Sequence, residues 1–145
     1  MSYMTYAKSS ECLFNRAMRR GVWQRLLRRL QRQPVELIPF DHARQSIEFG
    51  QQCERGIRPI PVRDIVGSLG RVNEFDRDFM PINSSVENKW RRILRLKSMG
   101  IDLPPIEVYK LNGGYYVIDG NHRVSVSRFL GMDYIDAHVI EIACK

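Results

Sequence analysis

Several features that would assign this chain to a class at once are scarce or absent. It has three cysteines, Cys12, Cys53 and Cys144, an odd and widely spaced set that predicts neither a disulfide framework nor a zinc site. No run of about 18 apolar residues occurs, so no membrane-spanning segment is predicted. The first residues lack the charged-then-apolar pattern of a secretory signal. We therefore expect a protein of the reducing cytoplasm with no membrane partner.

Acidic residues are also missing from one long stretch. The net charge is +7, and no Asp or Glu lies between Phe14 and Gln33. Seven arginines fall in that window: Arg16, Arg19, Arg20, Arg25, Arg28, Arg29 and Arg32. Without them the remaining Lys and Arg equal the Asp and Glu in number, 16 of each, so the whole excess charge belongs to one segment. A confined patch of this kind indicates a polyanionic partner more strongly than a high isoelectric point does.

The same window has the spacing of a helix, predicted over 14–32. Phe14, Met18, Val22, Leu26 and Leu30 recur every four residues and are expected to form its buried face. Three interpretations of the arginines stay open. They form a solvated surface on a docked helix, a surface for nucleic acid or an acidic partner, or a contact with a membrane surface.

The rest of the chain predicts an α+β fold, a small mixed sheet packed by helices. We expect an N-terminal basic helical segment over 1–59 and a domain over 60–145, within one globular unit. The predicted strands are 60–66, 105–110, 115–118 and 134–142, and the further helices are 84–99 and 123–130, with a short one between Phe40 and Phe49. Ser84 with Glu87 three residues later predicts a capping box.

The residues with the clearest chemistry are Asp119, Gly120, Asn121, His122 and Arg123, between a predicted strand and a predicted helix. Gly120 lets the backbone turn and approach a ligand closely. The start of the following helix exposes unpaired N–H groups at the positive end of its dipole, and Arg123 can hold a phosphate with two hydrogen bonds. The loop therefore predicts a phosphate site, with His122 as a ligand contact or a packed neutral residue.

The order of motifs around this loop resembles the ParB/sulfiredoxin family. Pro105-Ile106-Glu107-Val108, the loop itself and Leu130-Gly131 follow the ParB N-terminal pattern of a "PI-x-V" strand, a "G-E-R-R" loop and a helix ending in "LG". The resemblance covers about 60–142 and is closest over 104–139. It implies a nucleotide, CTP, ATP or ADP, bound at the loop together with Mg²⁺. Sulfiredoxins have "G-C-H-R" and free-serine kinases of this fold "D-G-H-H-R", whereas this chain has D-G-N-H-R. Since Asn121 replaces the cysteine nucleophile, sulfiredoxin activity is not expected.

The resemblance also implies an opposing loop, Gly67 to Arg77, with polar groups that face the phosphate. Arg71 is expected to bind the ligand, and of Glu74 and Asp76 one would act as a general base and the other contact Mg²⁺. These acids could equally be surface residues paired with arginines. We expect Asp119 to bond the loop backbone or orient His122, and no metal site built by the protein alone.

Two function classes are consistent with the sequence. The first is a nucleotide- or phosphate-binding domain, with or without hydrolysis or transfer of that phosphate. The second is a DNA-associated ParB-like binding module or nuclease, supported by the arginine window. No helix-turn-helix follows the last predicted strand, so sequence-specific DNA recognition is not expected. The sequence does not predict an oligomeric state.

Overall fold

The structure, a computed structural model, describes residues 3–45 and 51–142. It confirms the α+β class. The helices are α1 (Tyr3–Leu30), α2 (Phe40–Gln45), α3 (Glu87–Ser98) and α4 (Asn121–Phe129), with short 3₁₀ turns η1 (Val62–Asp64) and η2 (Ser84–Val86). The strands are β1 (Ile38–Pro39), β2 (Gln52–Pro61), β3 (Ile65–Ser68), β4 (Ile106–Leu111), β5 (Gly114–Asp119) and β6 (Tyr134–Ile142).

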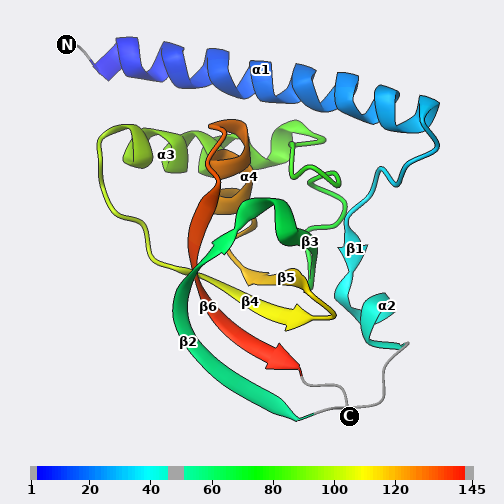
Figure 1. The fold of residues 1–145 in the computed structure, drawn as a ribbon. Helices are drawn as coiled ribbons and strands as arrows, with labels where there is room; N and C mark the ends of the chain where they lie inside the picture. The colour runs from blue at the N-terminus through cyan, green and yellow to red at the C-terminus, as the bar shows by residue number, and fades with distance from the viewer. Residues whose placement is uncertain (1–2, 46–50, 143–145) are drawn as a thin grey trace.

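The strands form one mixed sheet in the order β1-β3-β5-β4-β6-β2 (Figure 1). β3 runs parallel to β5, and β4 runs parallel to β6. β4 and β5 form an antiparallel hairpin, and β2 pairs antiparallel with β6. The hairpin turn includes Asn112 and Gly113, both with positive φ, as the Asn-Gly pair predicts. β5 therefore lies inside the sheet, and the loop that follows it starts from a fixed position.

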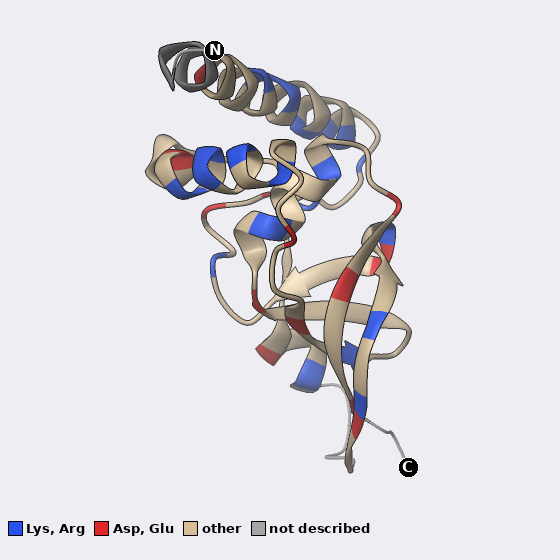
Figure 2. Cartoon of the chain, turned by 90° about the vertical axis from the view of Figure 1, so that its left-hand side faces the viewer, with Lys and Arg blue, Asp and Glu red and all other residues tan. Residues whose placement is uncertain are grey.

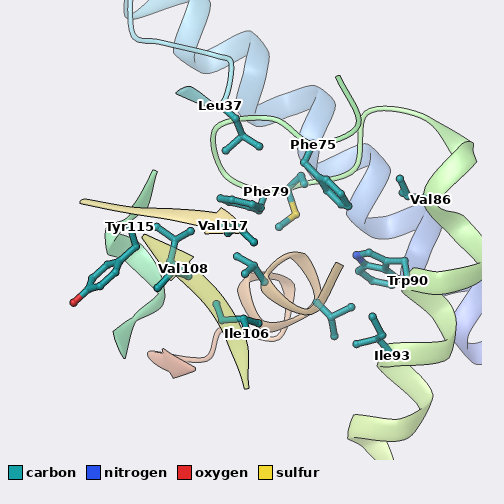
Figure 3. Packing of buried hydrophobic residues seen from close by; sticks show 14 of the residues in the cluster. Leu37, Phe75, Phe79, Val86, Trp90, Ile93, Ile106, Val108, Tyr115 and Val117 are labelled. Carbon is teal, nitrogen blue, oxygen red and sulfur yellow. The ribbon is translucent and has the colours of Figure 1, made fainter. Parts of the chain in front are cut away.

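Helices α1, α3 and α4 lie together on one side of the sheet (Figure 1). The core fills the space between them and the strands (Figure 3). Trp90 of α3 is fully buried, contacts Phe14 of α1 edge-on at 5.5 Å, and donates a hydrogen bond of 2.9 Å to Ser125 of α4. One side chain thus joins the three helices, and it holds α4 in place against the sheet.

The two tyrosines of β5 lie on opposite faces of the sheet. Tyr115 belongs to the main core, while Tyr116 packs on Phe40 of α2 with ring centroids 5.6 Å apart. Both are buried, because α2 packs through Phe40 against the second face of the sheet. The part of the short predicted helix beyond Gln45 lies outside the described residues.

Several predicted boundaries differ from the structure, and α1 begins at Tyr3 where the helix was predicted to begin at Phe14. The strand expected over 60–66 is divided: β2 ends at Pro61, a 3₁₀ turn follows, and β3 begins at Ile65. The expected boundary between residues 59 and 60 falls inside β2, so residues of the basic segment complete the sheet. The helical start near Ser84 is capped by Asn83, whose side chain accepts a hydrogen bond from the Ser85 N–H. The N-cap is therefore one residue earlier than predicted, and Glu87 does not stand at the third helical position that a capping box requires.

The predicted buried face of α1 is only half correct. Phe14 is buried, but the exposed fractions of Val22 and Leu30 are 57% and 73%. Lys and Arg recur along this helix in Figure 2, yet some arginines are turned inward, as described below. No helix in the described ranges is long and apolar enough to cross a membrane.

Candidate functional site

The candidate site begins where β5 ends. Asp119 closes the strand, Asn121 opens α4, and Gly120 alone makes the turn between them with φ of 112°. A Cβ at Gly120 would lie 2.5 Å from Cγ2 of the buried Ile106. Both the positive φ and the close approach require glycine, so the chain turns sharply into the helix. The predicted strand–loop–helix unit is present.

The first turn of α4 presents backbone donors. The first N–H to bond inside the helix is that of Val124, which donates to the Gly120 carbonyl at 3.0 Å. The N–H groups of Asn121, His122 and Arg123 precede it and have no acceptor within α4. They lie at the positive end of the helix dipole, where an anion is stabilised.

The residues that carry these donors line a cavity of about 340 Å³. Its lining comes from the loop after β3, from α3, and from the β5–α4 junction: Gly70, Arg71, Lys89, Ile93, Ile118, Asp119, Gly120, Asn121, His122 and Arg123. Arg71 and Lys89 bring positive charge from two further elements to the end of α4. The cavity is thus built to attract a negatively charged group.

Arg71 is held by its neighbour. It has φ of 62°, and its guanidinium donates a 3.0 Å hydrogen bond to Oε1 of Glu74. The other oxygen, Oε2, is buried without a hydrogen-bond partner in the described structure. Glu74, expected as a general base, therefore keeps one acceptor unused near the site, although it does not line the cavity itself.

Arg123 lines the cavity and also makes contacts that its position in the loop does not predict. Its guanidinium donates to the carbonyls of Pro104 and Pro105 at 2.5 and 3.1 Å, and to Asp119 at 3.2 Å. Asp119 was expected to bond the loop backbone or orient His122, and it pairs with Arg123 instead. Arg123 clamps the segment before β4 to α4, so several of its donors are already engaged.

Asn121 fastens the loop to the sheet. Its side chain is 7% exposed, and its Oδ1 lies 2.9 Å from the Ser68 hydroxyl at the end of β3. The same hydroxyl lies 3.2 Å from the Val117 carbonyl on β5. Ser68 thus holds the loop against β3 and β5. The carboxamide of Asn121 gives the site no nucleophile.

His122 is a buried, neutral part of the site. It is 7% exposed and contacts Phe75 edge-on at 5.2 Å. Burial lowers the pKa of His122 to about 4, and the positive charge of Lys89 acts in the same direction. At neutral pH the ring therefore offers a neutral donor or acceptor, not a third cation.

We expect the burial of His122 to make folding stability depend on pH. In the unfolded chain the pKa returns to 6.5, so the unfolded state binds more protons between pH 6.5 and about 4. The free energy of unfolding should therefore be highest above pH 6.5 and fall by about 3 kcal/mol as the pH falls through 6.5 to below 4. Urea unfolding at several pH values should show a smaller loss for His122→Gln than for wild type. His42→Gln, at an exposed position, is the control and should keep the wild-type slope.

Asp76, the second expected catalytic acid, lies elsewhere. It is 1% exposed, accepts from the N–H groups of Asp78 and Met80, and forms an ion pair of 2.8 Å with Arg25 of α1. Its oxygens are thus occupied in holding α1 to the domain. Arg28 forms a second pair with Asp78, with both hydrogen bonds at 2.8 Å. Two arginines assigned to a nucleic-acid surface therefore face inward.

The described residues do not fit a protein-held Mg²⁺. No group of three or more His, Cys, Asp or Glu side chains that could hold a metal occurs among them. Asp119 is the single carboxylate lining the cavity within this part of the chain, and it is paired with Arg123. The cavity lining is therefore positively charged, as expected for a site that binds an anion.

No family model matches the chain, and no curated protein matches it. Among solved structures it is similar to sulfiredoxin from Arabidopsis thaliana, with 25% sequence identity and a TM-score of 0.41. That similarity covers 57% of this chain and 82% of the other.

Sequence reasoning found the loop but missed two residues of the site. Lys89 is one of several basic residues on α3, and no local pattern distinguishes it from Arg92. Ser68 ends a short strand that we had placed in a loop. Both join the site only through tertiary structure, Lys89 because α3 packs against α4 and Ser68 because β3 pairs with β5.

Proposed function

We propose that the cavity at the start of α4 binds the phosphate group of a nucleotide or another phosphorylated small molecule. The observation that carries this is the convergence of three backbone N–H groups that have no acceptor within α4 with Arg71 and Lys89 around one cavity. Charge-assisted hydrogen bonds from such groups are among the stronger ones in proteins. The cavity volume lies within the usual range of about 300–1,000 Å³ for small-molecule sites.

The neutral His122 refines the proposal. A phosphate near the α4 N-terminus would accept from backbone N–H groups, while the buried ring provides one more neutral hydrogen bond. Glu74 is our candidate for a general base should the phosphate be transferred or hydrolysed, because Oε2 is unpaired while Arg71 fixes the carboxylate. The cavity can bind a phosphate group whether or not that phosphate is then transferred or hydrolysed.

Removing either cavity cation should weaken phosphate binding. We expect Lys89→Ala and Arg71→Ala each to lose about 1.5–3 kcal/mol, or roughly ten- to a hundredfold in affinity. Isothermal titration with ATP, ADP, CTP, GTP and pyrophosphate, with and without Mg²⁺, measures this. The matched control is Arg92→Ala, which removes one exposed cation from the same helix without touching the cavity lining.

Lys89→Arg should retain most of the affinity, since it keeps the charge. Wild-type affinity in both alanine variants would contradict the proposal, as would failure of every phosphate compound to bind the wild-type protein. Equal losses in Lys89→Ala and Arg92→Ala would indicate a general electrostatic effect instead of a site.

A further inference from the structure

The outer face of α1 is a separate feature that phosphate binding does not use. It consists of five large apolar side chains, 45–73% exposed, on the C-terminal half of the helix: Val22, Trp23, Leu26, Leu27 and Leu30. Trp23 is followed by Leu26, Leu27 and Leu30 at spacings of three, four and seven residues, so these side chains form one continuous stripe. Solitary exposed apolar residues are ordinary, but a contiguous stripe indicates a surface that is covered in function.

The stripe points outward because the other side of α1 is fixed. Gly21 lies close to the chain at Met80, where an added Cβ would be 3.1 Å from the Met80 Cβ. Arg25 and Arg28 on the same inner side form the ion pairs with Asp76 and Asp78. Rotating α1 to bury the stripe would break both pairs and leave the buried Asp76 without its cation. The exposure is therefore set by specific contacts and is not a loose orientation of the helix.

Positively charged side chains lie next to the stripe. Arg19 lies one helical turn before Trp23 and Arg16 two turns before it, while Arg29 lies beside Leu26 and Leu30. All three arginines are exposed. No acidic residue occurs between Phe14 and Gln33 to neutralise them. The outer face of α1 is thus apolar over its C-terminal half, with cationic side chains at the N-terminal end of the stripe and along one side of it.

We propose that the outer face of α1 docks onto the surface of an anionic phospholipid bilayer. Figure 1 shows α1 lying along one side of the domain, with the rest of the described chain on its inner side. A flat surface can therefore contact the helix along its length. The apolar side chains enter the boundary between headgroups and acyl chains, where tryptophan is favoured, and the arginines meet lipid phosphates.

Charge decides between this and other occupants. A second copy docked through the same face would bring arginines against arginines, which is repulsive. Nucleic acid would satisfy the arginines but would leave Trp23 and the leucines in water. An anionic bilayer satisfies both parts of the face. The expectation that the chain has no membrane partner rested on the lack of a membrane-spanning run, which does not bear on binding at the surface of a bilayer.

Vesicle binding by the full chain tests the proposal. Flotation with phosphatidylcholine vesicles, and with vesicles that also contain phosphatidylglycerol, gives the partition coefficients at about 0.1 M NaCl, where surface charges still act over about 10 Å. We expect binding only to the anionic vesicles, with a blue shift of Trp23 fluorescence. The other tryptophan, Trp90, is already buried and should not shift.

Two variants separate the apolar and charged parts. Trp23→Ser with Leu27→Ser, and Arg19→Gln with Arg29→Gln, should each lower the partition coefficient at least about tenfold. These side chains are exposed, so the variants should fold, which circular dichroism checks. Ile57→Ser removes an apolar side chain that is 67% exposed on β2 and should change nothing. Equal binding to neutral and anionic vesicles, or wild-type binding by either double variant, overturns the proposal. Two further results would overturn it. The first is a dimer in light scattering that Trp23→Ser abolishes, and the second is duplex DNA binding that depends on the arginines while no vesicle is bound.

Discussion

Replacing Gly120 by alanine should reduce both the folding stability and the phosphate affinity of this protein more than the loss of either cavity cation. The new Cβ would lie 2.5 Å from Cγ2 and 2.9 Å from Cβ of Ile106, a residue with no exposed surface. It would also hold an L-residue at φ of 112°. Strain and overpacking together should cost about 3–5 kcal/mol of unfolding free energy. Urea denaturation measures the loss, and titration with the tightest-binding nucleotide should show that the remaining folded protein binds weakly.

Gly113→Ala is the matched control. It has a similar left-handed backbone, with φ of 80°, but no described atom lies within 4 Å of the position its Cβ would take. It should lose only the conformational cost of about 1–2 kcal/mol. The difference between the two variants isolates the contact with Ile106. Ile106→Ala combined with Gly120→Ala should lose less than the sum of the single changes, because the truncated side chain makes room. Equal losses at the two glycines would contradict the close approach at the site.

Replacing Asp76 by alanine should destabilise the fold by about 3–5 kcal/mol, because it leaves a partly buried guanidinium without its partner. The carboxylate is 1% exposed and also accepts two backbone hydrogen bonds, so three interactions end together. Thermal and urea unfolding measure this loss. Phosphate affinity measured below the unfolding transition should change little, since Asp76 does not line the cavity.

An exposed ion pair provides the comparison. Asp64 lies 4.0 Å from Arg63, and both side chains are well exposed, so Asp64→Ala should change stability by less than about 1 kcal/mol. In a double-mutant cycle, Arg25→Ala combined with Asp76→Ala should be less destabilising than the two single losses added. If the losses of stability in the two single variants simply added, the Arg25–Asp76 ion pair would contribute nothing beyond the packing of each side chain. If Asp76→Ala lowered the phosphate affinity without lowering the stability, Asp76 would have to act in phosphate binding.

The elements found from the sequence are those with local signals. Gly113 marks the β4–β5 hairpin, Gly120 marks the start of α4, and Gly100 has the positive φ of a residue that ends a helix. The division between β2 and β3 was missed because the β-branched residues Val62, Ile65 and Val66 continue a strand pattern across the 3₁₀ turn Val62–Asp64. Propensity cannot anticipate such a bend when tertiary contacts decide it.

The orientation of α1 was mispredicted for a geometric reason. A spacing of four residues advances about 40° beyond a full turn of a helix with 3.6 residues per turn. The sequence Phe14, Met18, Val22, Leu26, Leu30 therefore winds around the helix from the buried side to the opposite one. The side that stays buried repeats every three or four residues, through Phe14, Ala17 and Gly21. Its continuation is Arg25 and Arg28, whose acidic partners could not be identified before the fold was known.

The order of the strands has a consequence for how molecules of this protein meet. The sheet ends at β1 and at β2. β1 offers two residues, one of them Pro39, and β2 is interrupted by a register shift between Glu54 and Ile57 around Gly56. Two further prolines, Pro59 and Pro61, have no N–H to donate. Neither border gives a neighbouring chain a long, regular row of hydrogen-bonding groups, so growth of the sheet from one molecule into the next is disfavoured.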